Sequence, residues 1–324
     1  MNGMDVTRRP SGRWIIDFGW EMSEQEAALY EAPYAYIVEH VRPVRLENRR
    51  EAYATYWWRH VEPRPGMWRA MGSLTRYIAT PRIARHRVFA WVDKSTIPDC
   101  QLIVTTRDDD VSFGILHSRF HEAWALRLCT WLGVGNDPRY TPSTTFETFP
   151  FPAELTQSHP AAFYASNSHA MDISAAARRL DELRCNWLNP TDLVRAVSEV
   201  APGYPERLLP ANDAAAAILK TRTLTNLYNE RPAWLTNAHR DLDAAVAAAY
   251  GWPADISEDD ALGRLLELNQ VRAAAQKARP RRIPQPGPQQ TLLLPIAGDK
   301  EPIADRASEA ESPKKRERRR ARTT

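Results

Sequence analysis

The chain has 324 residues, of which 43% are hydrophobic, and its 43 Lys and Arg nearly balance 40 Asp and Glu. This length is enough for two modest domains with buried cores, and no apolar run reaches the roughly 18–20 residues of a membrane span. The three cysteines (Cys100, Cys129 and Cys185) lie far apart, which excludes a disulfide scaffold or a cysteine zinc site and favours a soluble, cytoplasmic protein with reduced thiols.

The first 60 residues are predicted to contain one strand followed by helices. Residues 13–19 (RWIIDFG) form a short apolar run that ends in glycine, which is typical of a strand. Ser23 and Glu26 match a capping box, and they open a helix that Pro33 interrupts or restarts. Residues 34–60 then have a helical and strongly basic character.

The next ninety residues are predicted to form a sheet, a long helix and a closing segment. Residues 76–81, 86–93 and 99–106 are rich in β-branched and aromatic side chains, so we expect three strands of one sheet. A long helix is expected over 113–132, with one buried face composed of Phe113, Leu116, Phe120, Trp124, Leu128 and Trp131. The proline-punctuated segment 140–152 is expected to run extended across a surface.

The remaining chain is expected to be helical and then disordered. Residues 160–276 show apolar side chains at helical spacing throughout, and Ser257 with Asp260 suits a helix cap. From residue 277 the composition turns to Pro, Gln, Arg and Lys, which predicts a disordered basic tail. The fold class is therefore α+β: a mixed α/β domain (1–155), an all-helical domain (156–276) and the tail (277–324).

Basic side chains are concentrated in one block of the first domain. Residues 1–155 carry 19 basic and 19 acidic side chains, yet residues 41–87 alone contain eleven Arg against three Glu. Arginine forks suit phosphate oxygens and guanine edges, and a neighbouring aromatic ring can stack on a base. A solvated Arg-rich loop is the alternative, but few local acids neutralise it. The candidate DNA-binding residues are Arg76, Tyr77, Arg82, Arg85, His86, Arg87 and Arg119, with Arg42, Arg45, Arg49, Arg50 and Arg59 as an extension.

The sequence gives little support to a catalytic, cofactor-binding or metal-binding function. No Gly-rich nucleotide turn, P-loop or Asp/Asn-Pro-Pro-aromatic tetrapeptide is present. His117 and His121 could share a metal at i and i+4 of a helix, but no third ligand has a recognisable spacing. The two rings are therefore interpreted as core histidines with satisfied hydrogen bonds. Pro98-Asp99 lacks the acid-x-Lys that a nuclease signature would require. We thus expect no catalytic residue, no cofactor site and no metal in this chain.

Five segments resemble one known family. They are NGMDVTRRP (2–10), RYIATPRIARHR (76–87), GILHSRFHEAWALRL (114–128), YTPSTTFETFPFP (140–152) and TLTNLYNERPAWLTNAHRDLDAAVAAAYGW (223–252). Together they resemble the C-terminal half of MmeI-like class I SAM-dependent DNA methyltransferases, which include fused type II restriction–modification enzymes that methylate adenine N6. The resemblance implies a target recognition domain and a helical C-terminal domain. It also implies double-stranded DNA as the partner and S-adenosylmethionine as the cofactor of the catalytic half.

The chain begins inside the family pattern at Met1, so we expect the catalytic half to be absent from it. Three functional hypotheses remain open. The first is a DNA sequence-recognition module that holds duplex DNA while a methyltransferase domain extrudes an adenine. The second is one half of a split adenine-N6 methyltransferase that is active with a separate SAM-binding subunit. The third is a non-catalytic protein-docking scaffold.

Overall fold

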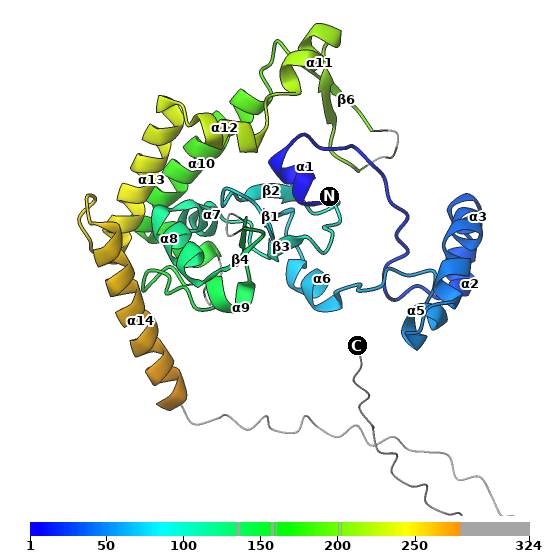
Figure 1. Ribbon diagram of the computed structural model, residues 1–324, viewed down its shortest axis with the longest axis horizontal. Helices are drawn as coiled ribbons and strands as arrows, with labels where there is room; N and C mark the ends of the chain where they lie inside the picture. The colour runs from blue at the N-terminus through cyan, green and yellow to red at the C-terminus, as the bar shows by residue number, and fades with distance from the viewer. Residues whose placement is uncertain (135–136, 157–158, 160, 200, 202, 279–324) are drawn as a thin grey trace, which may run out of the picture. The chain divides into compact units, whose positions relative to one another are not determined.

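The computed structural model describes residues 1–278, except 135–136, 157–158, 160, 200 and 202 (Figure 1). The predicted disordered tail lies, from residue 279 onward, outside the described residues. Helices with small antiparallel sheets make up the described part, which confirms the α+β class. None of the described helices is long and apolar enough to cross a membrane.

The elements follow one another in a mixed order, with β-strands in both halves of the chain. The strands are β1 (Arg76–Pro81), β2 (Ala90–Asp93), β3 (Leu102–Thr105), β4 (Thr130–Leu132), β5 (Asp137–Arg139), β6 (Val194–Val197) and β7 (Arg207–Pro210). The helices are α1 (Gly3–Thr7), α2 (Glu24–Ala28), α3 (Glu31–His40), α4 (Arg42–Leu46), α5 (Glu51–Thr55), α6 (Pro65–Met71), α7 (Asp110–His117), α8 (Arg119–Leu128), α9 (Pro142–Thr145), η1 (Ala161–Ser166), α10 (Ser168–Leu188), α11 (Asp213–Leu219), α12 (Leu224–Glu230), α13 (Ala233–Tyr250) and α14 (Glu258–Ala278).

The first sheet positions the basic segment of the sequence. Strand β1 lies between β2 and β3 and is antiparallel to both, with Ile78 opposite Trp91 on one side and Thr105 on the other. Ile78 is fully buried, and the Trp91 ring stacks on Phe113 of α7 with centroids 4.6 Å apart. The predicted three-stranded sheet is confirmed, although β2 and β3 are shorter than predicted.

The strand predicted at residues 13–19 is wrong. This segment is irregular, and no described strand pairs with it. Trp14 and Ile15 are 51% and 54% exposed, and the Trp14 ring meets Tyr204 edge-on at 4.6 Å. An apolar run forms a strand only if a neighbouring strand is present to form backbone hydrogen bonds with it. Local composition does not reveal whether such a neighbour exists.

The single helix predicted over 113–132 is also wrong, because Ser118 divides it. Ser118 is extended (φ −67°, ψ 151°) between α7 and α8, and its hydroxyl accepts a hydrogen bond from the backbone N–H of His121. A serine side chain that caps a helix start favours this break. Downstream, Leu128 is 40% exposed and Trp131 lies in β4 with 48% of its surface exposed, so neither belongs to the buried face.

The second half of the chain is helical except for one hairpin. Strands β6 and β7 form an antiparallel pair where helix was expected. The predicted cap of the last helix is confirmed, since the Ser257 hydroxyl accepts from the Asp260 N–H at 3.1 Å. One hydrophobic core extends from Val6 to Leu265 through both predicted domains. The boundary near residue 155 stays a prediction.

Gly114 on α7 lies where two other helices approach closely. A Cβ added there would lie 2.8 Å from Ile173 Cγ2, 3.0 Å from Ala177 Cβ and 3.1 Å from Leu242 Cδ1. The first two neighbours belong to α10 and the third to α13, so a glycine lets three helices meet. This contact packs α7, which follows the first sheet in the chain, against α10 and α13.

We expect Gly114→Ala to lower the free energy of unfolding by about 1–3 kcal/mol, the usual cost of overpacking a core. Gly263→Ala is the matched control, because Gly263 is also helical and an added Cβ would meet nothing within 4 Å. The control should be neutral or stabilising by about 0.5–1 kcal/mol, since alanine has the better helix propensity. Urea unfolding measures both, and equal stability of the Gly114→Ala variant and the parent would contradict the tight approach.

Residues 16–60 contain a second, smaller core. Phe18, Ala27, Ile37 and Trp57 are buried together and form a cluster separate from the main one. The predicted capping box is present, since Ser23 accepts from the Glu26 N–H and the Glu26 carboxylate accepts from the Ser23 N–H. The prediction that residues 34–60 are helical is confirmed, since they contain most of α3 and all of the short helices α4 and α5. This segment is called the 16–60 unit below.

Candidate nucleic-acid interface

The loop that follows β1, residues 82–88, is fixed by its main chain. The Arg82 N–H donates to the Gln101 carbonyl at 2.7 Å, and the Arg82 carbonyl accepts from the Tyr140 N–H at 2.7 Å. One residue further, Ile83 forms an antiparallel bridge with Arg139 of β5. The loop therefore lies between the edge of the first sheet and the β4–β5 hairpin, and the side chains of Arg82 and Ile83 are not needed for these main-chain contacts.

Two of the predicted arginines are available to a ligand. Arg85 is exposed and Arg82 is half-buried. Neither makes an ion pair with any carboxylate in the part of the chain that the structure describes. Their charge is therefore not compensated within the protein, as the count of acids around this segment predicted.

His86 is anchored to the helical half. Its Nε2 lies 2.8 Å from Asn229 Oδ1, and its ring centroid is 5.9 Å from that of Tyr228. Since one ring nitrogen is engaged, His86 fixes the end of the loop against α12. A DNA contact could involve only the remaining part of the half-buried ring.

Arg87 points into the protein and is only 6% exposed. Its guanidinium donates to Thr80 Oγ1 at 2.9 Å and to the Pro81 carbonyl at 2.5 Å. It also lies over the Tyr140 ring, with its Cζ 4.8 Å from the centroid. Burial lowers the pKa of Arg87 to about 10, so the group stays charged at neutral pH. Arg87 therefore joins the end of β1 to the segment after β5 and is not accessible to a polyanion.

Tyr77 does not meet the expectation that its ring stacks on a base. The side chain has no exposed surface, and its hydroxyl donates to the Thr96 carbonyl at 2.7 Å. Burial raises the pKa of its phenol. The prediction treated Tyr77 as a neighbour of the basic loop, whereas its position in the middle strand β1 directs it into the core.

Arg76 and Arg119 are engaged within the protein. Arg76 lies 3.6 Å from the Trp91 ring centroid and pairs with Asp110 at 3.0 Å. Arg119 donates to the Ile256 carbonyl at 2.7 Å and lies over the Phe120 ring. The residues that precede Arg119 offer no accessible side chain to a base edge, because Val111 through Ser118 are all buried.

The two histidines that could have shared a metal are core histidines. His121 is buried and its Nε2 lies 3.0 Å from the Tyr140 hydroxyl. His117 Nδ1 faces the Phe113 carbonyl at 3.1 Å, while its Nε2 accepts from the Phe89 N–H at 3.1 Å and from Arg184 at 2.6 Å. Burial holds the pKa of His117 well below its usual range and lowers that of His121 to about 3, so both rings are neutral at neutral pH. No group of three metal-ligating side chains occurs among the described residues.

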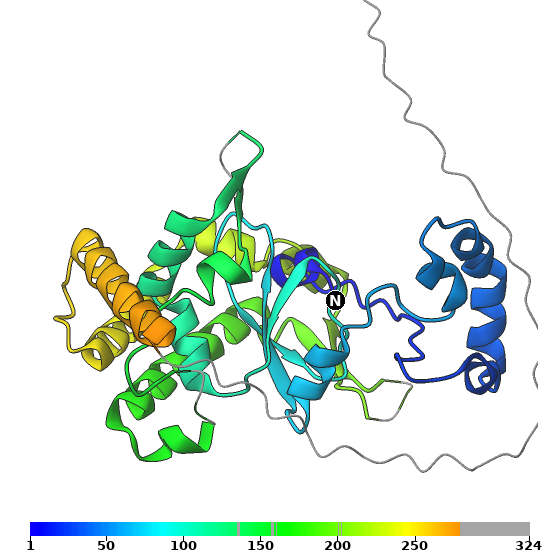
Figure 2. The same ribbon diagram turned by 90° about the horizontal axis from the view of Figure 1, so that it is seen from below.

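The β4–β5 hairpin beside the loop was missed by the sequence analysis. It pairs Thr130 with Arg139, and Figure 2 shows it projecting from the helices beside it. Its side chains are unusually accessible for apolar residues, with Trp131 48% and Val134 95% exposed. Arg139 is exposed as well and, like Arg82 and Arg85, has no ion pair with a described carboxylate. The turn-forming residues of GVGNDP (133–138) could have indicated a hairpin, but the prediction used them only as the end of the helix over 113–132.

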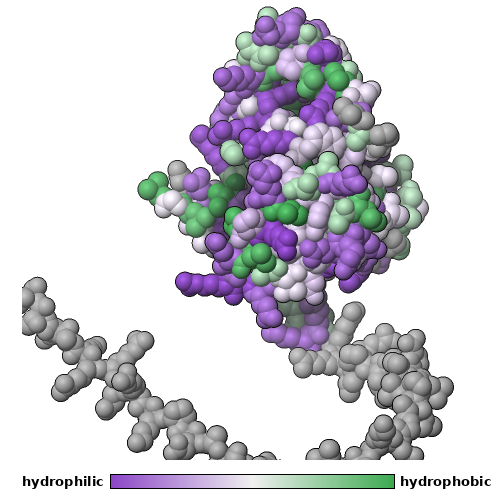
Figure 3. All heavy atoms as spheres, turned by 90° about the vertical axis from the view of Figure 1, so that its right-hand side faces the viewer, coloured by the Kyte–Doolittle hydropathy of each residue, from purple (hydrophilic) through white to green (hydrophobic). Residues whose placement is uncertain are grey.

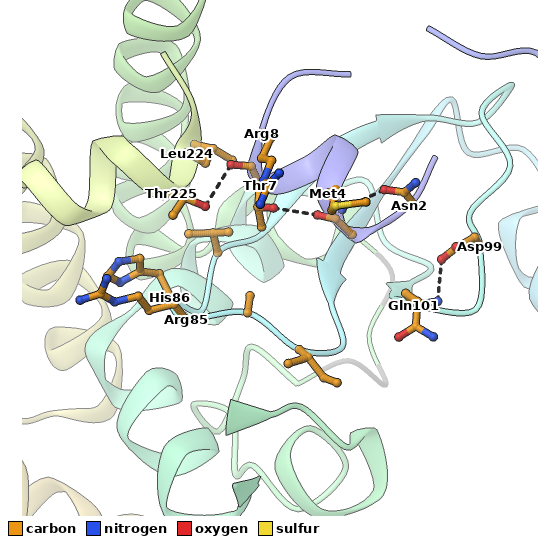
Figure 4. Close-up of a pocket in the computed structure, with 14 residues that line it drawn as sticks. Asn2, Met4, Thr7, Arg8, Arg85, His86, Asp99, Gln101, Leu224 and Thr225 are labelled. Atoms are coloured by element: carbon orange, nitrogen blue, oxygen red, sulfur yellow. Dashed lines mark hydrogen bonds between the residues drawn. The ribbon is translucent and has the colours of Figure 1, made fainter. Parts of the chain in front are cut away.

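A cavity of about 420 Å³ lies at the other side of the loop, between α1, residues 83–88 and the start of α12. Figure 4 shows Arg85 and His86 together on one side of it, with Thr7 and Arg8 on another. Arg8, in the TRRP segment, is exposed. It was not among the predicted DNA-binding residues. Exposed arginines thus flank the loop on both sides.

Comparison with known proteins found one family model and one solved structure that are similar to this chain. The family model for the MmeI target recognition domain matches residues 11–153. A solved structure of the Type IIL restriction-modification enzyme MmeI in complex with DNA covers 85% of this chain with a TM-score of 0.57 at 18% identity. The chain spans 30% of the length of that protein, and no curated protein matches it. The resemblance stated from the sequence motifs is confirmed: residues 11–153 match the MmeI target recognition domain, and the solved MmeI structure shares its fold with most of this chain.

Proposed function

We propose that this chain is the DNA sequence-recognition part of an adenine-N6 methyltransferase of the restriction–modification type. The observation that carries the proposal is the cluster of solvent-accessible arginines, without ion pairs to the described carboxylates, around a loop that is anchored by its backbone. Arg82 and Arg85 extend from residues 82–88, and Arg139 lies on the strand that bridges to Ile83. In a domain of the MmeI type, a surface of this charge fits duplex DNA.

In the proposed mechanism, different side chains supply the affinity for DNA and the recognition of its sequence. Arginine contacts to phosphates supply salt-dependent affinity and set the orientation of the duplex. Side chains on loop 82–88 and on the projecting β4–β5 hairpin read base edges, for which the major groove is wide enough to admit a two-stranded ribbon. Methyl transfer belongs to a SAM-binding methyltransferase domain, on the same polypeptide or on a separate subunit, which receives the extruded adenine.

A selection experiment tests this proposal. We expect the full chain, immobilised and incubated with duplexes of random sequence, to enrich one short sequence motif over successive rounds. Binding to the enriched duplex should exceed binding to a shuffled duplex by at least about 10³-fold at physiological salt, the lower end of the specificity of site-specific proteins. Recovery of unselected sequences at every salt concentration would refute sequence recognition by this chain.

A further inference from the structure

We infer that the 16–60 unit is a second DNA contact, which binds the phosphodiester backbone without regard to sequence. The contact surface consists of Arg42 and Arg45 on α4 with Arg49 and Arg50 in the turn before α5, and it is called the α4–α5 surface. This inference rests on the proposed DNA-binding function but concerns residues apart from loop 82–88. It assigns the unit to affinity and leaves base readout to the loop and the hairpin.

The α4–α5 surface is built on a folded support. Trp57 is 3% exposed, and its indole N–H donates to Glu24 Oε1 at 3.1 Å, which ties the end of the unit to α2. The Tyr34 hydroxyl donates to the same carboxylate oxygen at 3.0 Å. Because the unit has its own core, exposed arginines on α4 can be replaced without removing any buried side chain.

The positive charge of this surface is not neutralised by the unit itself. Residues 42–50 contain four arginines and one acid, Glu47. Arg42, Arg49 and Arg50 are exposed and Arg45 is half-buried. Within the described residues, none of the four lies within ion-pair distance of a carboxylate. Such a set of like charges favours a ligand that carries closely spaced negative charges.

Aromatic rings hold three of these arginines in place. The Tyr53 ring is close to both Arg45 and Arg50, whose Cζ atoms are 5.6 and 5.2 Å from the ring centroid. Arg50 also donates to the Tyr53 hydroxyl at 2.5 Å, and Arg42 lies 5.2 Å from the Trp57 ring. A guanidinium stacked on a ring keeps N–H donors at its edge for phosphate oxygens, and its side chain loses less freedom when a ligand binds.

The phosphate backbone is the ligand that this chemistry recognises best. Phosphate contacts come mainly from arginine and lysine and carry no sequence information. In the space-filling view of Figure 3, hydrophilic side chains cover much of the face that is shown, and hydrophobic ones are scattered among them. Because its four arginines are spread along residues 42–50 with a single acid, the α4–α5 surface offers distributed charge, which suits an extended polyanion.

The test is the triple variant Arg45→Gln, Arg49→Gln, Arg50→Gln of the full chain. Its matched control is Arg178→Gln, Arg179→Gln, Arg240→Gln, which removes three exposed arginines that are each paired with an acid, Asp110, Glu182 and Asp241 respectively. Both variants lose the same charge. Binding to the selected duplex and to a mixed-sequence duplex is measured over a range of salt concentrations, after circular dichroism and thermal unfolding confirm the fold.

We expect the α4–α5 triple variant to bind both duplexes at least about tenfold more weakly, with equal loss on each. The slope of log affinity against log salt should flatten by nearly three units, about 0.9 for each lost phosphate contact. The control should retain the parent slope. Tyr53→Leu, which removes the ring and keeps the charge, should weaken binding to both duplexes about equally because Arg45 and Arg50 lose their support.

The outcomes separate this inference from the proposed function. A parent chain that binds no duplex would refute the proposed function and the inference with it. A parent that binds selectively, with an α4–α5 variant of unchanged affinity and slope, would overturn the inference alone. An equal fall in both triple variants would also overturn it, because net charge and not this surface would then determine binding. Loss of discrimination in the α4–α5 variant would assign these residues to base readout and contradict the backbone role.

Discussion

Replacing Arg82 and Arg85 together by glutamine is expected to weaken binding of duplex DNA at least about tenfold and to flatten its salt dependence by nearly two units. Both side chains extend from loop 82–88, whose backbone is anchored at Arg82, and neither pairs with a described acid. Glutamine keeps hydrogen-bonding capacity but removes the charge. A salt titration by fluorescence anisotropy measures affinity and slope in one experiment.

The fold of this double variant should be unaffected, because the loop is fixed through the backbone of Arg82 and not through its side chain. Arg178→Gln with Arg240→Gln is the control of equal charge, since both of these arginines are exposed and paired with acids. If the Arg82/Arg85 variant shows the parent affinity and slope while remaining folded, the basic loop is a solvated surface. DNA recognition would then depend on other parts of the domain.

Arg87→Met should have a contrasting effect, since it removes a buried group that binds no ligand. The Pro81 carbonyl and Thr80 hydroxyl lose a donor, and a buried polar group left unpaired costs about 1–3 kcal/mol. We expect a loss of about 2–4 kcal/mol in unfolding free energy. Discrimination between the selected and the shuffled duplex should fall about tenfold, because the segment between β1 and β5 loses its clamp.

The salt slope distinguishes this effect from a direct contact. Arg87→Met should keep the parent slope, because its guanidinium lies too deep to displace counterions from DNA. Arg87→Lys restores the charge but not the fork that reaches two acceptors, so it should rescue stability only in part. A slope that drops by about one unit in a folded Arg87→Met protein would place this side chain on a phosphate and contradict its buried position.

Elements decided by neighbouring residues could be predicted from the sequence. The cap at Ser23, the cap at Ser257 and the strand at 76–81 each depend on residues a few positions apart. The break at Ser118 depends on distant residues as well. The backbone N–H of Arg119 donates to Asp243 Oδ1 on α13 at 2.8 Å, a contact across 124 positions. The helical periodicity of a sequence cannot reveal such a distant partner.

The sequence selected the basic loop as a whole and could not separate its exposed residues from its buried ones. A count of arginines along a window treats Arg85 and Arg87 alike, although one is exposed and the other is 6% exposed. The difference arises because Arg87 finds acceptors on Thr80 and Pro81, which only the folded turn brings near it. Arg139 was missed for the converse reason, since it joins the loop only through the bridge to Ile83.

The main-chain anchoring of loop 82–88 has a consequence for how this protein can change. Because Gln101 and Tyr140 bond the backbone of Arg82, side chains at 82, 83 and 85 have little part in holding the loop in place. Under the proposed function, substitutions there alter what the surface offers to DNA with little effect on stability, whereas substitutions at Arg87 alter both. New target preferences would then be accessible by single steps at the outer positions, while the inner arginine is expected to resist drift in any lineage that keeps the loop.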